Sequence, residues 1–276
     1  MKLDRAKEII LKAKKSVFTG NIGNNLTAFK GDGLDFAEIR NYNSGDDIKK
    51  INWKATAKTG ELKLNEFHEE RELHIVVVAM LSGSLLFGTK RLKNEVMAEL
   101  LALIGFSAIN NGDRFESIIF SNKLERHFKP SKRVGQVEGA VEELLSINPI
   151  GKEANFGELT TFLQAKLKKK AIVIILSDFY EEIDLSLLSR HQLYTIAIRD
   201  HFEEEPNLSG ELELIDPTSQ KEMELNINSN IIKKYKNAIK NLDNKLKEEA
   251  LEYGATYGKI YCNDELYIRT SQIFKG

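Results

Sequence analysis

The stretch His74–Ser84, HIVVVAMLSGS, decides the fold that this chain is expected to adopt. Its β-branched run Ile75–Val78 predicts a strand that is buried on both faces, as in a parallel sheet. The strand is expected to end at Met80, and the loop Ser82-Gly83-Ser84 then leads into a predicted amphipathic helix over residues 90–111. A strand, a small polar loop and a helix in this order are typical of the binding edge of an open α/β sheet.

The rest of the carboxyl-terminal part alternates between strand and helix patterns. Further strands are predicted at residues 115–120, 171–176, 192–198 and 256–261, with a hairpin partner at 124–128 and an edge strand at 212–215. Helices are predicted at residues 133–146, 156–168, 183–189, 229–253 and 264–274. Such alternation predicts a doubly wound, mostly parallel sheet that is covered by helices on both faces.

Residues 1–70 are expected to form a small β-rich amino-terminal extension, and residues 71–276 the sheet domain. The extension is expected to hold helices at residues 3–15 and 48–58 and strands at 36–42 and 61–67. Asp46 and Asp47 follow a glycine turn and are expected to cap the second helix, with Arg40 as an ion-pair partner for one of them. Trp53 is expected to be a core residue that anchors this extension onto the sheet domain.

Composition excludes several classes of protein. The 276 residues carry 40 Lys+Arg against 41 Asp+Glu, and this balance argues against a nucleic-acid binder that works through a basic field. No apolar run approaches the roughly 20 residues that span a bilayer, and no secretion signal is recognisable. The single cysteine, Cys262, rules out an intrachain disulfide and fits a reducing cytoplasm. The histidines lack metal-ligand spacing and no nucleophile motif occurs, so we predict no catalytic residue.

Three segments share their order and spacing with a known family. One segment is the strand with its Ser82-Gly83-Ser84 loop, and another is Ile174–Phe179, which contains Asp178. The amino-terminal segment contributes a motif that is expected to be structural: Gly31, Gly33, Phe36, Arg40, Tyr42, Gly45, Asp46, Asp47 and Trp53. In these segments the chain resembles the bacterial family called domain of unknown function 58, which carries a von Willebrand factor A-like domain. Asp200 and Glu203, after the strand at 192–198, agree with the resemblance.

The resemblance implies a metal-ion-dependent adhesion site at the carboxyl ends of the strands. Such a site takes Asp-x-Ser-x-Ser from a first loop, a Thr from a second and an Asp from a third, and binds Mg²⁺ through hard oxygen ligands. Here Met80 stands in place of the first Asp and Ala154 in place of the Thr, so that only Ser82, Ser84 and Asp178 remain. A thioether does not replace a carboxylate as a magnesium ligand.

We therefore predict a degenerate site without a stoichiometric metal or other cofactor. Mg²⁺ would bind through the remaining serines and aspartate only if Glu153 or Asn155 rescued the site. With Met80 present, Ser82 and Ser84 are expected to hydrogen-bond the backbone or cap a helix, as loop serines usually do. Asp178 is expected to cap a helix.

The resemblance also implies a function. Members of the family that the chain resembles often act beside MoxR-type AAA+ ATPases and other von Willebrand A-like proteins. The resemblance therefore implies a non-enzymatic cytoplasmic adaptor, for which we expect no nucleic-acid partner and no membrane segment. The alternative is a metal-dependent hydrolase that uses Asp178 together with Asp46 or Asp47.

Overall fold

The computed structural model describes residues 2–19, 35–43, 45–68 and 72–275, and the chain forms two compact units. The large unit comprises Met1–Ala28 and His74–Gly276, and the small unit comprises Phe29–Leu73. The expected division at residue 70 therefore needs one correction, because the amino-terminal helix belongs to the large unit.

The large unit is built on a six-stranded sheet with the order β10-β7-β6-β3-β4-β5. Its neighbouring strands are parallel except for β5, which pairs antiparallel with β4, so the predicted hairpin and the mostly parallel sheet are confirmed. Every residue of β6 and all but the first of β3 are buried, as their β-branched runs predicted. The strands are β3 (His74–Met80), β4 (Arg114–Phe120), β5 (Leu124–Ser131), β6 (Ile172–Ser177), β7 (Gln192–Arg199) and β10 (Thr256–Tyr261).

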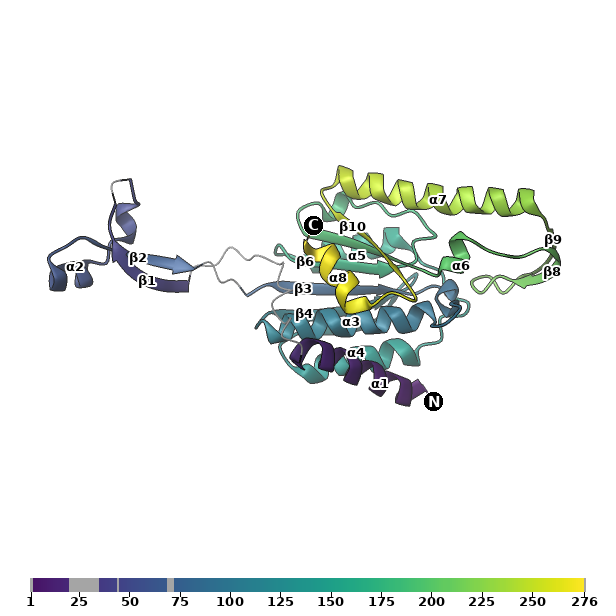
Figure 1. Cartoon of the computed structure of the whole chain (residues 1–276), viewed down its shortest axis with the longest axis horizontal. Coiled ribbons are helices and arrows are strands. Elements are labelled where there is room, and N and C mark those ends of the chain that lie inside the picture. The colour runs from purple at the N-terminus through teal and green to yellow at the C-terminus, as the bar shows by residue number, and fades with distance from the viewer. Residues whose placement is uncertain (1, 20–34, 44, 69–71, 276) are drawn as a thin grey trace. The chain divides into compact units, whose positions relative to one another are not determined.

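Helices cover both faces of this sheet, which confirms the doubly wound architecture (Figure 1). Short 3-10 turns η3 (Gly83–Leu86) and η4 (Ser186–Leu188) lie in two of the loops, and only η4 remains of the helix expected at 183–189. The helices are α1 (Lys2–Lys14), α3 (Lys93–Asn110), α4 (Val134–Ser146), α5 (Phe156–Lys166), α6 (His201–Glu204), α7 (Ser229–Glu252) and α8 (Leu266–Lys275). A short π-helix, η1 (Lys15–Thr19), follows α1.

Helix α3 is buried around its whole circumference, which corrects the expectation of an amphipathic helix. A helix that is buried all round requires cover on every side, and α1 provides part of it through its buried stripe Ala6, Ile9, Ile10 and Ala13. Ion pairs fix α1 there, including Lys12 Nζ to Glu99 Oε1 at 2.8 Å. This packing is why α1 groups with the large unit.

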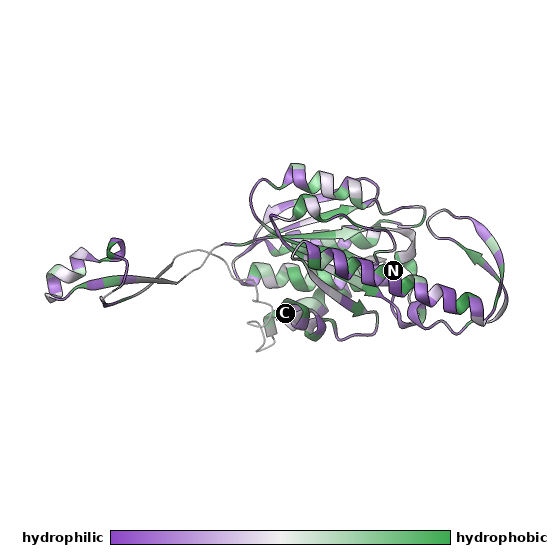
Figure 2. Cartoon of the chain, turned by 90° about the horizontal axis from the view of Figure 1, so that it is seen from above, coloured by the Kyte–Doolittle hydropathy of each residue, from purple (hydrophilic) through white to green (hydrophobic). Residues whose placement is uncertain are grey.

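Strands β8 (Gly210–Ile215) and β9 (Glu222–Ile227) form a separate two-stranded hairpin. The strand expected at 212–215 is therefore present, but it pairs with β9 and not with the six-stranded sheet. Figure 2 shows apolar residues gathered in the interior of the large unit and hydrophilic residues on its outer elements. Among the described residues, no helix has the length and apolarity that crossing a membrane requires.

The small unit pairs β1 (Asp35–Asn41) antiparallel with β2 (Lys63–His68). The helix expected at 48–58 is divided into η2 (Ile48–Lys50) and α2 (Trp53–Thr59), because the Asn52 backbone N–H donates to Lys63 and its side chain caps α2. Trp53 is 67% exposed, so it does not belong to a core formed by the small unit itself, and its expected anchoring onto the sheet domain stays a prediction. Of the proposed motif, Gly31 and Gly33 lie outside the described residues, and Phe36 lies in β1.

Candidate functional site

The first and third loops of the predicted site meet at the carboxyl edge of the sheet. Because β3 and β6 are neighbours, the serines after β3 lie beside Asp178, which follows β6. The Ser84 hydroxyl donates to Asp178 Oδ2 at 2.5 Å, and the Ser82 hydroxyl lies 2.7 Å from Ser84 Oγ and 3.4 Å from Asp178 Oδ1. The expectation that these serines bond only backbone or cap a helix is therefore wrong, since their hydroxyls bond each other and Asp178.

A buried lysine completes this cluster. Lys93, the first residue of α3, is 0% exposed, and its ammonium donates to Asp178 Oδ2 at 2.9 Å and to Glu203 Oε1 at 2.5 Å. Burial alone would lower the pKa of Lys93, but the two carboxylates raise it above its ordinary value. Burial would likewise raise the pKa of Asp178, but Lys93 and the Ser84 hydrogen bond hold it below its ordinary value. Lys93 and Asp178 are therefore both charged at neutral pH.

Aromatic and cationic groups enclose the lysine. The Tyr180 hydroxyl donates to Glu203 Oε1 at 2.7 Å, and the Lys93 ammonium lies 4.9 Å from the Tyr180 ring centroid. Arg199, fully buried at the end of β7, donates to the Asp178 backbone carbonyl and to Asp243 Oδ1 at 3.0 Å. Each charge in this interior therefore has a partner of opposite sign or a hydrogen bond.

Glu203 owes its position to a capping box at the start of α6. Its Oε2 accepts from the Asp200 backbone N–H at 2.7 Å, while Asp200 accepts from the Phe202 N–H. Asp200 also accepts from the Thr89 backbone N–H at 2.9 Å, which ties α6 to the segment between β3 and α3. The loops after β3 and β7 are thus joined through carboxylates.

Met80 and Ala154, which the resemblance implies stand in place of adhesion-site ligands, pack against the apolar core. Met80 is 0% exposed among core residues, and Ala154 packs against the same cluster. Asn155 Oδ1 is used to cap α5, accepting from the Glu158 N–H at 3.0 Å, and Glu153 is exposed. Within the described ranges, no three His, Cys, Asp or Glu side chains are arranged to hold a metal ion. The donor set does not fit Mg²⁺, because its one adhesion-site carboxylate, Asp178, is already paired with Lys93.

Comparison with known proteins identifies the family of this chain. The family described as "Protein of unknown function DUF58" matches residues 38–245. The chain belongs to the DUF58 family. Uncharacterised proteins of Mycobacterium tuberculosis and Mycobacterium bovis are 25% identical to it over 206 residues, which cover 71% of this chain. The chain spans 65% of the length of these curated relatives.

Solved structures resemble the chain at low sequence identity. The conserved hypothetical protein BatB from Bacteroides thetaiotaomicron aligns with a TM-score of 0.48 at 12% identity, over 73% of this chain and 96% of that one. A von Willebrand factor type A protein from Catenulispora acidiphila aligns with a TM-score of 0.44 at 13% identity, over 89% of this chain and 50% of that one.

In this DUF58 chain, the Gly-Asp-Asp turn of the small unit is held by an ion pair. Arg40 donates two hydrogen bonds to Asp46, at 2.8 and 2.9 Å, which confirms the expected pair. These bonds and the Asn43 N–H lower the pKa of Asp46 to about 2. Asp47 caps η2 by accepting from the Lys49 N–H at 3.0 Å, as expected. The two carboxylates thus have separate partners, which weakens the case for a catalytic dyad.

An apolar pocket of about 430 Å³ opens beside the Ser84 and Lys93 cluster. Its polar lining includes Ser84, Tyr180 and Glu203, and its apolar walls come from the β8–β9 hairpin, from α7 and from Phe87 and Phe202. The hairpin reaches the serine loop itself, since a Cβ on Gly83 would lie 2.2 Å from the Pro217 carbonyl oxygen. Only glycine permits this close approach at residue 83.

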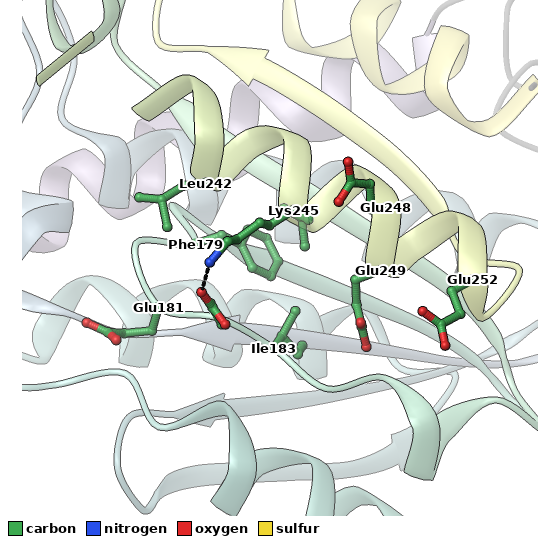
Figure 3. Close-up of a pocket in the computed structure, with 10 residues that line it drawn as sticks. Phe179, Glu181, Ile183, Leu242, Lys245, Glu248, Glu249 and Glu252 are labelled. Atoms are coloured by element: carbon green, nitrogen blue, oxygen red, sulfur yellow. Dashed lines mark hydrogen bonds and ion pairs between the residues drawn. The ribbon is translucent and has the colours of Figure 1, made fainter. Parts of the chain in front are cut away.

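A second pocket, of about 250 Å³, lies between α7 and the segment that follows β6 (Figure 3). Glu248, Glu249 and Glu252 project from α7 beside it, opposite Glu181. Lys245 pairs with Glu182 at 2.5 Å, and Phe179 contributes to an apolar floor. Acidic side chains therefore surround the apolar floor of this pocket.

Proposed function

We propose that this chain is a non-enzymatic, cytoplasmic protein-interaction module that acts beside a MoxR-type AAA+ ATPase in the assembly or remodelling of protein complexes. Membership of the DUF58 family and the resemblance described above support this role. Other von Willebrand A-like proteins are the second class of partner that we propose.

The observation that carries the proposal is the apolar pocket at the carboxyl edge of the sheet. Its walls include Leu214 and Leu225 from the hairpin and Ile231 from α7, so that its lining is mostly hydrocarbon. Concave apolar surfaces with a few fixed polar groups are suited to anchoring the apolar side chains of a partner. Lys93 and Asp178, whose cluster shares Ser84 and Glu203 with the pocket lining, are buried and paired with one another.

The pocket also explains how recognition can proceed without a metal bridge. In a metal-dependent adhesion site, the ion keeps one position open for a partner's carboxylate. Here Lys93 is fully buried, so its ammonium does not offer a partner the open position that a bound ion would provide. We therefore propose that packing and hydrogen bonding, with the pocket as the anchor, replace the bridging ion.

Capture experiments with the cognate MoxR-type ATPase test this proposal. The immobilised chain is expected to retain the ATPase at low and at moderate salt, with and without a chelator. An empty capture at both salt concentrations would count heavily against the proposed partner.

A pair of adjacent substitutions localises the contact. Leu214 lines the pocket, whereas Ile215 lies next to it on the opposite face of β8, because strand side chains alternate between faces. Leu214→Asp is expected to reduce capture at least about tenfold, and Ile215→Asp to leave it within about twofold. Equal losses in both variants would place the contact elsewhere.

A further inference from the structure

Four hard oxygen donors converge at the carboxyl edge of the large sheet. They are the hydroxyls of Ser82 and Ser84 and the carboxylates of Asp178 and Glu203, and the two carboxylates are 1% and 6% exposed. Two buried negative charges are costly unless a positive charge lies beside them. In oxygen-lined sites of proteins, a divalent cation often supplies that charge.

In this chain the positive charge is a side chain. The Lys93 ammonium lies 2.9 Å from Asp178 Oδ2 and 2.5 Å from Glu203 Oε1, and Asp178 Oδ2 also accepts from Ser84. We propose that Lys93 is the built-in cation of this site and occupies the position that a divalent ion would otherwise take. This proposal deepens the metal-free recognition proposed above and rests on it only in part. It concerns the group that takes the place of a divalent ion, and not the identity of the partner.

The surroundings of Lys93 disfavour a second cation. A divalent ion bound to either oxygen of Asp178 would lie close to the ammonium that is bound to Oδ2, and like charges repel strongly in a buried site. Arg199 adds another positive charge, because its guanidinium donates to the Asp178 carbonyl oxygen. Mg²⁺ also needs about six oxygen ligands, whereas Met80 and Ala154 offer none from their side chains.

Removing the ammonium should therefore convert the cluster into a metal site. In Lys93→Ala, the oxygens of Asp178 and Glu203 that now face Lys93 would face a vacancy next to the Ser84 hydroxyl. We expect Mn²⁺ to bind this variant at least about tenfold more tightly than the wild type in titration calorimetry. We also expect Mn²⁺ to raise the melting temperature of the variant but not that of the wild type.

A matched control shows whether binding occurs at this cluster. The double variant Lys93→Ala, Asp178→Asn differs from Lys93→Ala only in that an amide of almost the same shape replaces one carboxylate, and it should lose the gained Mn²⁺ affinity. If Lys93→Ala needs Mn²⁺ in order to fold, the result supports the proposal, because the ion then substitutes for the ammonium. A folded Lys93→Ala that binds Mn²⁺ no better than the wild type would overturn it.

The wild-type protein gives a test that no folding defect can obscure. Millimolar Mn²⁺ should leave the amide NMR signals of Ser84 and Asp178 unbroadened, because Lys93 already occupies the site. Selective broadening of these signals would overturn the proposal. Failure to capture the ATPase, with these metal results as expected, would remove the proposed partner and leave the role of Lys93 intact.

Discussion

Each of the two units of this chain contains a basic side chain paired with an aspartate, and the two pairs differ in how deeply they are buried. The pair in the large unit, Lys93 and Asp178, is almost completely buried, with side chains 0% and 2% exposed. The pair in the small unit, Arg40 and Asp46, is partly exposed, at 31% and 21%. The N–O distance does not distinguish the two pairs, since it is 2.8 Å in the small unit and 2.9 Å in the large unit.

The difference teaches that burial, not distance, decides what such a pair does. Water screens the exposed pair and would solvate either member if its partner were removed. The buried pair has no such alternative, so each charge depends on the other. The buried pair can therefore define a site, whereas the exposed one stabilises a turn.

The largest expected effect comes from breaking the buried pair. Asp178→Ala leaves the Lys93 ammonium in the interior with only Glu203 as a charged partner, and we expect a loss of about 3–5 kcal/mol in the free energy of unfolding. Urea denaturation followed by far-ultraviolet circular dichroism measures this loss. The matched control is Asp46→Ala, followed by the fluorescence of Trp53, the single tryptophan, which lies in the small unit. A shift for Asp178→Ala no larger than that of the control would break the comparison.

Glu116 is expected to give an effect between those of the two aspartates. Glu116 is 1% exposed, and the Nε2 atoms of His74 and His127 each lie 2.6 Å from one of its oxygens. Burial would raise the pKa of Glu116, but the two histidines hold it below its ordinary value. The folded-state pKa is thus the lower one, so the stabilisation is present above the unfolded-state pKa and is lost as pH falls through the folded-state value.

Glu116→Gln is expected to cost about 1 kcal/mol at neutral pH, because the amide keeps the shape but loses the charge-assisted hydrogen bonds. The cost should shrink as pH falls through the lowered folded-state pKa of Glu116, because the wild-type carboxylate is then itself protonated. Urea midpoints across a pH series measure this dependence. A cost that stays constant down to the acid range would contradict the assigned role of Glu116.

The smallest effect is expected at the exposed pair. Arg40→Ala should raise the pKa of Asp46 from about 2 toward its ordinary value, because the main cause of the depression is the Arg40 hydrogen bond. Since the folded-state pKa is the lower one, the stabilisation by the pair is fully present above the unfolded-state pKa of the aspartate and is lost as pH falls toward about 2. Carboxyl NMR titration of Asp46 measures the change, and an unaltered pKa would exclude the ion pair in solution.

The architecture was predictable because its signals are local. The β-branched runs at Ile75–Val78 and Ile172–Ile175 specify buried parallel strands, and the apolar stripes of the helices specify their faces. The hairpin strand at 222–227 was missed, although its alternation of glutamates and apolar residues is a strand signal. The position of α1 was also missed, because it depends on the all-round burial of α3.

The candidate site was only half predictable. Ser82, Ser84 and Asp178 were recognised through the resemblance, and the structure brings them together. Lys93 was not recognised, because a lysine at the start of a helix is usually solvated. Its burial depends on contacts with Asp178 and Glu203, which lie 85 and 110 positions away in the sequence. For Glu203 the sequence does carry a signal. The pattern Asp-x-x-Glu after a strand predicts the capping box that positions this side chain.

Anomalous diffraction from crystals of the wild-type protein grown with Mn²⁺ tests the central claim most directly. If Lys93 is the cation of this site, no anomalous peak will lie among Ser84, Asp178 and Glu203, and the ammonium will be seen between the two carboxylates. A manganese peak within coordination distance of Asp178, with Lys93 displaced, would contradict the account.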